Sequence, residues 1–128
     1  MASLALEIVE VDPDPLYRAI LSESLDAALA HCEPNRNILL ENIGVSPDYP
    51  EGRLFCPGHS AEVAWFLLHI LKHHPDPAKQ ARVLDILESS LNFGWDEDHG
   101  GLYYFMDIQG RPTLQLESSM KLWWPHTE

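Results

Sequence analysis

The chain has 128 residues with a formal net charge of −12, and 45% of its residues are hydrophobic and 22% charged. This length and composition suit one soluble globular domain with a core of its own. The negative charge argues against nucleic acid or an anionic membrane as a partner, because phosphates would be repelled, and no apolar run approaches the ~20 residues that span a bilayer. Two cysteines without a disulfide framework, and an N-terminus without a basic region, predict a cytoplasmic protein.

The first part of the chain predicts two helices followed by extended segments. Residues 1–11 resemble the end of a helix, and after a turn at Asp12–Pro15 a second helix is predicted over Leu16–Cys32, with apolar residues at helical intervals. Two extended segments then enclose a loop that contains proline and glycine, so a hairpin is predicted at Asn37–Phe55.

The middle of the chain predicts an enclosed helix followed by an amphipathic one. The segment from Ala61 to Leu71 is apolar on nearly every face, which is typical of a helix surrounded by protein. The next helix has Asp76 as a candidate N-cap, with proline at the first helical position. Its single apolar stripe is formed by Val83, Leu84, Leu87 and Leu91. This pair indicates an inner and an outer layer of helices.

The last third predicts a hairpin and the start of another helix. The hairpin is predicted at Leu102–Glu117 with its bend at IQGR, and the helix begins at SSMKLWW. The preceding segment GWDEDHGG lacks key calcium ligands and is better explained as a turn with Gly100 and Gly101 at positive φ. Together the elements predict an all-α fold, part of an α/α barrel with short β-hairpin excursions; a four-helix bundle with one decorated loop is the alternative.

The stretch PGHSAEVAW contains the first candidate site. His59, Glu62 and Trp65 follow one another at intervals of three, which makes His59 and Glu62 neighbours on a helix. The positive end of the helix dipole disfavours an imidazolium while Glu62 favours it, and this balance would keep the imidazole available for proton transfer near neutral pH. The alternative is a histidine that caps the helix beside a surface ion pair.

The final WWPHTE contains the second candidate site. Trp124 and Glu128 are four residues apart, hence on one face of a continuing helix. An indole ring packs on the C–H face of a sugar, and a carboxylate accepts hydrogen bonds from its hydroxyls. The alternative is that the two tryptophans belong to the core and that Glu128 is a solvated acid. His69 and His73 have a spacing that can bind a metal, but no third ligand is near in sequence, so no metal site is predicted.

Three motifs, in this order and spacing, resemble the N-acylglucosamine 2-epimerases, also called renin-binding proteins: PGHSAEVAWFLL, GWDEDHGGLYYFMDIQGRPTLQLE and MKLWWPHTE. The likeness covers residues 37–128 and extends more loosely back to Met1. It implies that residues 1–128 are the central portion, truncated at both ends, of a single (α/α)6 barrel domain.

The activity that the resemblance implies is interconversion of N-acylglucosamine and N-acylmannosamine, by removal and return of a proton at C2 of the open-chain sugar. The alternatives are an aldose–ketose isomerase or a cellobiose 2-epimerase of the same superfamily, a non-catalytic interaction protein, and an inactive truncated product. No cofactor is required for this chemistry, and ATP is an expected effector of complete family members.

The resemblance also implies roles for individual residues. His59 matches a catalytic histidine and Glu128 an active-site glutamate. The expected substrate-binding residues are Glu62, Trp65, Trp124 and His126. A second catalytic histidine and an active-site arginine would lie outside these residues, so the chain alone is expected to be inactive and to self-associate through exposed barrel helices, with a homodimer as one form.

Overall fold

The computed structural model describes residues 2–12 and 14–128, so Met1 and Pro13 of the predicted first helix and turn lie outside the described residues. The described part is mainly helical, as predicted. Its helices are α1 (Ala2–Val9), α2 (Pro15–Leu29), α3 (Pro57–His73), α4 (Pro77–Gly94) and α5 (Trp123–Thr127). Its strands are β1 (Cys32–Glu33), β2 (Ile38–Leu39), β3 (Leu54–Phe55) and β4 (Met106–Asp107), and a 3-10 turn, η1, spans Pro50–Arg53.

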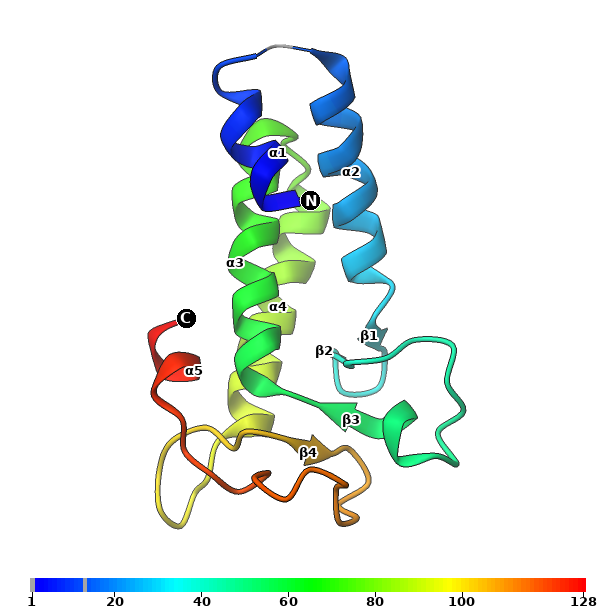
Figure 1. Cartoon of the computed structure of the whole chain (residues 1–128), viewed down its shortest axis with the longest axis vertical. Helices are drawn as coiled ribbons and strands as arrows, with labels where there is room; N and C mark the ends of the chain where they lie inside the picture. The colour runs from blue at the N-terminus through cyan, green and yellow to red at the C-terminus, as the bar shows by residue number, and fades with distance from the viewer. Residues whose placement is uncertain (1, 13) are drawn as a thin grey trace.

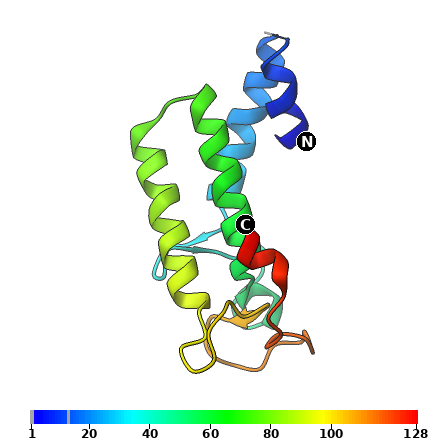
Figure 2. The ribbon, with the colours of Figure 1, turned by 90° about the vertical axis from the view of Figure 1, so that its left-hand side faces the viewer.

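Helix α3 is the central element of the molecule. Helix α4 runs beside it in the opposite direction, while α1, α2 and α5 contact its other sides. The short strands lie beside and below its N-terminal end (Figures 1 and 2). The core residues of α3 are Ala61, Ala64, Leu67, Ile70 and Leu71. Within the described residues no helix is both long enough and apolar enough to cross a membrane.

The N-termini of α2 and α4 follow the same local rule. Each has an aspartate as its N-cap and a proline directly after it, and the proline costs nothing there because the first helical N–H has no partner in the helix. Asp14 accepts a hydrogen bond from the backbone N–H of Leu16 at 2.8 Å. Asp76 accepts two, from Ala78 and Lys79, each at 3.0 Å, which confirms the predicted cap.

The buried stripe of α4 differs from the prediction. Val83 is buried as expected, but Leu84 and Leu91 are 47% and 38% exposed, and Ile86 is buried in their place. The stripe continues from Ile86 along one side of the helix to Ser90 and Gly94, at the intervals of three and four that a straight helix requires. The prediction is therefore wrong for Leu84 and Leu91, whereas Leu87 is partly buried and packs against the core.

Two glycines allow close packing at the start of α3. A Cβ atom on Gly94, the last residue of α4, would overlap the ring of Pro57. A Cβ atom on Gly58 would lie 2.7 Å from the Cη2 atom of Trp124 and 2.8 Å from the Cβ atom of Pro125. Both contacts are shorter than side chains tolerate, so α3 can begin between α4 and α5 only because these two positions lack side chains.

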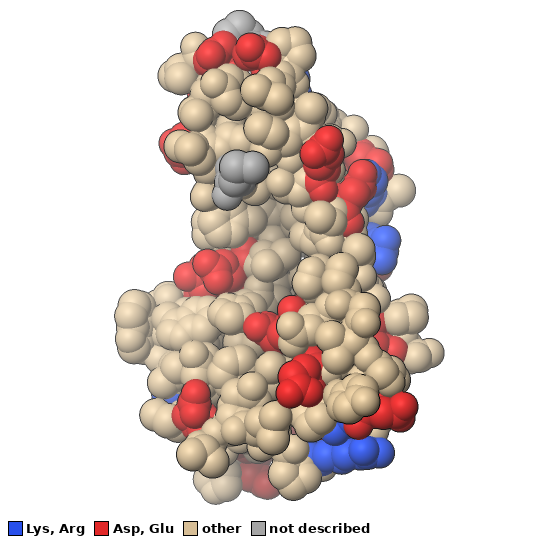
Figure 3. All heavy atoms as spheres, turned by 45° about the vertical axis from the view of Figure 1, so that its right-hand side comes forward, with Lys and Arg blue, Asp and Glu red and all other residues tan. Residues whose placement is uncertain are grey.

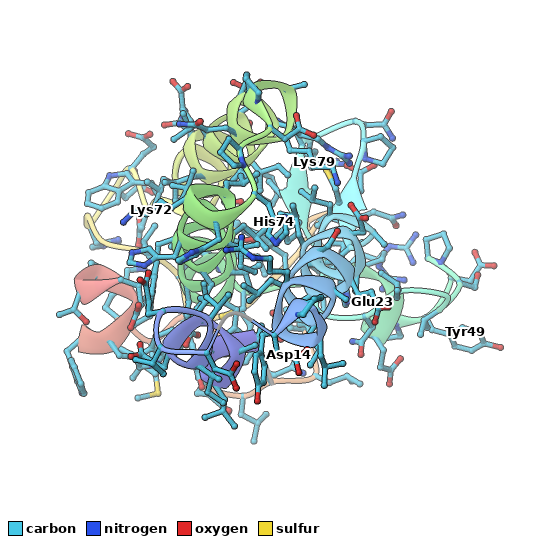
Figure 4. All side chains as sticks on the ribbon, turned by 90° about the horizontal axis from the view of Figure 1, so that it is seen from above. Asp14, Glu23, Tyr49, Lys72, His74 and Lys79 are labelled. Carbon is cyan, nitrogen blue, oxygen red and sulfur yellow. The ribbon has the colours of Figure 1, made fainter. Side chains whose placement is uncertain are left out.

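The predicted hairpin at Asn37–Phe55 is only partly present. Its two segments meet through a bridge between Leu40 and Phe55, and the backbone N–H of Glu41 donates to the carbonyl of Leu54 at 2.9 Å. The strands themselves pair elsewhere, β2 with β1 and β3 with β4, both antiparallel. The connecting loop projects outward, and Tyr49 lies at the edge of the molecule when it is viewed from above, whereas His74 lies between the helices (Figure 4).

The predicted hairpin at Leu102–Glu117 is wrong. Its one strand, β4, pairs with β3, which precedes α3 and α4 in the sequence, rather than with the residues after the bend. The bend itself is present, since Gly110 has a φ of 73° and its N–H donates to the carbonyl of Asp107 at 2.9 Å. A buried ion pair between Arg53 and Asp107, 2.8 Å long, reinforces the β3–β4 pairing and explains why that partner is preferred.

The predicted helix at SSMKLWW begins later than expected. The carbonyl of Ser118 accepts hydrogen bonds from the backbone N–H groups of Tyr104 and Phe105, at 3.0 and 3.1 Å. These bonds hold the segment against the loop after α4, and α5 therefore begins only at Trp123.

Candidate active site

His59 lies in the first turn of α3, and Glu41 holds its ring. Cys56 is the N-cap of this helix and Pro57 its first residue, and in this largely buried first turn the side chain of His59 is the one that is partly exposed. The Nδ1 atom of His59 is 3.0 Å from both carboxylate oxygens of Glu41. Glu41 is fixed in turn by its main-chain bond to Leu54, so two segments that are separated by the outer loop form this pair.

The surroundings of His59 favour its charged form. The side chains of Cys56 and Glu41 beside the ring raise the pKa of His59 to about 10, although partial burial opposes them. The sequence had predicted Glu62 as the partner and a pKa balanced near neutrality. The structure corrects both points, because the residue that engages the ring is Glu41 and the imidazolium is stabilised.

Trp124 covers His59 from the side of α5. The two ring centroids are 5.3 Å apart with their planes inclined by 34°, and Tyr104 meets the indole edge-on at 6.2 Å. Gly58 makes this approach possible, since any side chain there would collide with the indole. The side chain of His59 remains 44% exposed, so the aromatic cover leaves part of the ring accessible.

Trp65 and Glu128 form a second pair one turn or more further along α3. The indole Nε1 of Trp65 donates to Oε2 of Glu128 at 2.6 Å. The indole ring also stacks on Phe66, at 4.0 Å between centroids, and meets His69 edge-on at 5.4 Å. The structure thus joins the two sequence motifs, since the C-terminal segment contacts α3 through the Trp65–Glu128 hydrogen bond and through Trp124 on His59.

His126 holds α5 in place through main-chain contacts. Its Nε2 accepts a hydrogen bond from the N–H of Leu102 at 2.9 Å, so the ring proton lies on Nδ1, which donates to the carbonyl of Leu122 at 2.7 Å. Both ring nitrogens are therefore occupied, and the contacts of His126 in this structure are those of a residue that positions α5.

Asp96 organises the loop that His126 touches. Its carboxylate accepts hydrogen bonds from the N–H groups of Asp98 and His99 and from the ammonium of Lys121, the last at 2.9 Å. Lys121 holds the pKa of Asp96 well below its usual range. Gly100 and Gly101 have φ values of 74° and 82° as predicted, and the loop therefore uses its acid for turn formation.

A pocket of about 260 Å³ opens beside His59, between α2, β2 and α3. Its polar lining consists of His31, Glu41, His59, Ser60 and Glu62. The volume is close to the lower limit of the ~300–1,000 Å³ typical of small-molecule sites. The space-filling view shows a hollow at the waist of one face, with acidic side chains around it (Figure 3).

The structure therefore separates the predicted site residues into a group around His59 and a second pair further along α3. His59 and Glu62 line the pocket, and Trp124 contacts His59 from another side. Trp65 and Glu128 bind each other outside the pocket lining. Sequence reasoning missed Glu41, whose only signal was an acid that directly follows the apolar run NILL.

Comparison with known proteins identifies the family. The profile of N-acylglucosamine 2-epimerase (GlcNAc 2-epimerase) matches residues 2–128. The N-acylglucosamine 2-epimerase of Mus musculus is 37% identical over 136 aligned residues, which cover 100% of this chain and 32% of the mouse protein. The enzymes of Rattus norvegicus and Homo sapiens are 43% and 42% identical over 106 and 104 residues, which cover 78% of this chain and 25% and 24% of theirs.

The chain therefore belongs to the N-acylglucosamine 2-epimerase family. It spans about a third or less of the length of these curated relatives. The resemblance inferred from the three sequence motifs is confirmed.

Proposed function

We propose that this chain contributes part of the active site of a sugar 2-epimerase that interconverts N-acylglucosamine and N-acylmannosamine. The observation that supports it is the His59–Glu41 pair on the wall of the pocket, in a chain of this family. The carbonyl at C1 of the open-chain sugar would acidify the C2 proton, and His59 would transfer a proton at that carbon.

The geometry suggests which nitrogen of His59 reacts. Because Glu41 accepts from Nδ1, the free nitrogen is Nε2, for which the described residues provide no hydrogen-bond partner. The neutral ring would remove the C2 proton through Nε2, and the imidazolium so formed would return a proton to C2 from Nε2. The Nδ1 proton stays on the ring and remains hydrogen-bonded to Glu41 throughout. The raised pKa makes the proton-donating form of His59 the resting form.

The remaining residues would bind the sugar and complete the fold. Glu62 would accept hydroxyl hydrogen bonds inside the pocket, and Trp124 would offer its ring beside His59. Trp65 and Glu128 would present an indole and a carboxylate already bonded to each other. We also propose that α3 is an inner helix and α4 an outer helix of an (α/α)6 barrel.

Hydrogen exchange at C2 tests the proposal, because it separates proton transfer from inversion. Near pH 10, where part of His59 is neutral and can remove the C2 proton, the 128-residue chain in D2O should place deuterium at C2 of N-acetylmannosamine. It should not form N-acetylglucosamine, because one proton-transfer group serves one face of C2. His59→Gln should lower the exchange rate by ~10²–10⁴-fold, the usual contribution of a general acid–base group.

His99→Gln is the matched control, since its side chain is 82% exposed and lies in the loop after α4. This variant should retain the wild-type exchange rate, followed by NMR. Equal exchange rates in the two variants would remove His59 from the chemistry.

A further inference from the structure

Three different metal-ligating side chains meet at the start of α3. One donor atom each from Glu41, Cys56 and His59 lies within 4.8 Å of the other two. Two of these residues belong to one helical turn, because Cys56 is the N-cap and His59 follows three residues later, a spacing that brings the two side chains together. Glu41 reaches them from the segment after β2, which is pinned to Leu54.

We propose that Glu41, Cys56 and His59 form a binding site for a thiophilic divalent cation such as Zn²⁺. A thiolate, an imidazole and a carboxylate are the donor types that Zn²⁺ takes, at about 2.3, 2.0–2.1 and 2.0–2.2 Å respectively. Ligand atoms around a tetrahedral ion at those distances are ~3.3–3.8 Å apart. The Glu41–His59 separation of 3.0 Å would therefore lengthen slightly, and the separations that involve Cys56, at most 4.8 Å, would shorten by up to about 1.2 Å; side-chain rotation can supply both changes.

The surroundings select the kind of ion and leave one coordination position open. Cys56 is fully buried, so its sulfur has few competing solvent contacts, and the thiolate favours Zn²⁺, Co²⁺ or Cd²⁺ over Mg²⁺ and Ca²⁺, which prefer oxygen. Three protein ligands beside the pocket would leave the fourth position to water or to a small ligand. The thiolate and the carboxylate together balance the charge of a divalent ion.

Binding has a defined proton balance. Cys56 loses its thiol proton and His59 binds through a deprotonated Nδ1, so the ion displaces protons into solvent, and Glu41 exchanges its hydrogen bond to the ring for a bond to the metal. The histidine spacing that first suggested a metal, His69 and His73, is not needed, since His73 instead forms an ion pair with Glu10 at 3.2 Å.

Cobalt titration of the 128-residue chain tests the proposal without relying on activity. Co²⁺ should bind one-to-one and give the thiolate-to-cobalt charge-transfer band together with the intense visible bands of tetrahedral cobalt, and Zn²⁺ should abolish both. Cys56→Ser should remove the charge-transfer band. Glu41→Gln should weaken Co²⁺ binding by at least about tenfold, because loss of even an outer-shell partner of a ligand typically costs about 10–100-fold in affinity. Cys32→Ser is the matched control, because Cys32 is the other free cysteine and lies outside the cluster.

A second measurement needs no variant. In the wild-type chain, Zn²⁺ should shift the imidazole NMR signals of His59 and leave those of His99 and His126 unchanged. Absence of a thiolate band in the wild-type chain, its persistence in folded Cys56→Ser, or unchanged His59 signals would each overturn the proposal.

Discussion

Helices α1 to α4 form one region of the molecule, and the strands and loops below them form another. The contacts that stabilise the first region differ in kind from those that stabilise the second. The helices share one apolar cluster, which includes Leu21, Leu25, Ala64, Leu67, Ile70 and Val83. The lower region has a small cluster around Phe55 and relies on directional polar contacts such as Arg53–Asp107 and Asp96–Lys121, at 2.8 and 2.9 Å. These contacts join residues 54 and 25 positions apart.

This difference shows how the candidate site is assembled. His59 belongs to the well-packed helix α3, whereas Glu41 and Trp124 reach it from the polar lower region. Burial of apolar surface is not directional, so the helical core can vary in detail, but each polar contact fixes one geometry. The position of the groups around His59 therefore depends on a few specific bonds.

The largest effect is expected from Asp107→Ala. The substitution leaves the guanidinium of Arg53, which is 3% exposed, buried without its carboxylate. Breaking a buried pair in this way costs about 3–5 kcal/mol, so the free energy of unfolding in urea should fall by that amount. Lys79→Ala, which removes an exposed pair with Asp26, should cost less than about 1 kcal/mol. Similar losses in both variants would contradict the contrast between buried and exposed pairs.

His126→Ala should have an intermediate effect and act locally. It removes the acceptor of the buried Leu102 N–H and the donor to Leu122, at a cost of ~1–3 kcal/mol. Because α5 loses its anchor, Trp124 should move away from His59, which tryptophan fluorescence and the His59 NMR signals would report. The exposed His99→Ala should change stability by less than ~0.5 kcal/mol. Unchanged fluorescence in His126→Ala would mean that other contacts position α5.

Ile86→Val should cost about 0.5–1.5 kcal/mol, since it removes one methylene from a fully packed position in the helical core. The site should be undisturbed, and the NMR signals of His59 and Trp124 should match those of the wild-type chain. Leu84→Val is the matched control on the exposed side of the same helix. A change in the His59 signals on Ile86→Val would show that the two regions are more strongly coupled than their contacts indicate.

Glu41→Gln should change stability least and the pKa of His59 most. Cys56 and Glu41 raise this pKa from 6.5 to about 10, so loss of the carboxylate should bring it down, as an NMR titration of the ring would measure. Because the pKa of His59 is higher in the folded than in the unfolded chain, its protonation adds to the free energy of unfolding. This contribution is fully present below pH ~6.5 and is lost as the pH rises towards 10.

The stability difference between wild type and Glu41→Gln should therefore be larger at pH 6 than above pH 10. It should stay under ~1 kcal/mol, because the imidazole is nearly half exposed and solvent screens the pair. Glu62→Gln is the control, and it should leave the titration of His59 nearly unchanged. An equal shift in both variants would restore Glu62 as a partner of the ring.

Sequence periodicity predicted the helical region well and the site only in part. The α3 and α4 helices and the Asp76 cap follow from local signals, and so does the bend at Gly110. Glu41 was missed because it lies 18 residues before His59, while helical spacing pointed to the nearer Glu62. Long-range pairing decides such cases, and spacing along one helix carries no information about it.

The predictions of strand pairing were wrong for the same reason. A hairpin between neighbouring segments is the simplest interpretation of Leu102–Glu117, but the buried carboxylate of Asp107 selects Arg53, which precedes two helices. Likewise, α5 starts late because Ser118 is held by main-chain bonds to the loop after α4. Local propensity was overridden in both cases by contacts between distant segments.

The glycines at 58 and 94 have a consequence for natural variation among relatives of this chain. Neither has the positive φ that usually explains a glycine; each instead acts as a spacer of zero size between two segments. Position 94 should therefore covary with position 57, and position 58 with the pair Trp124–Pro125. A lineage that acquires a side chain at position 58 would have to shrink Trp124, and with it the aromatic cover of His59.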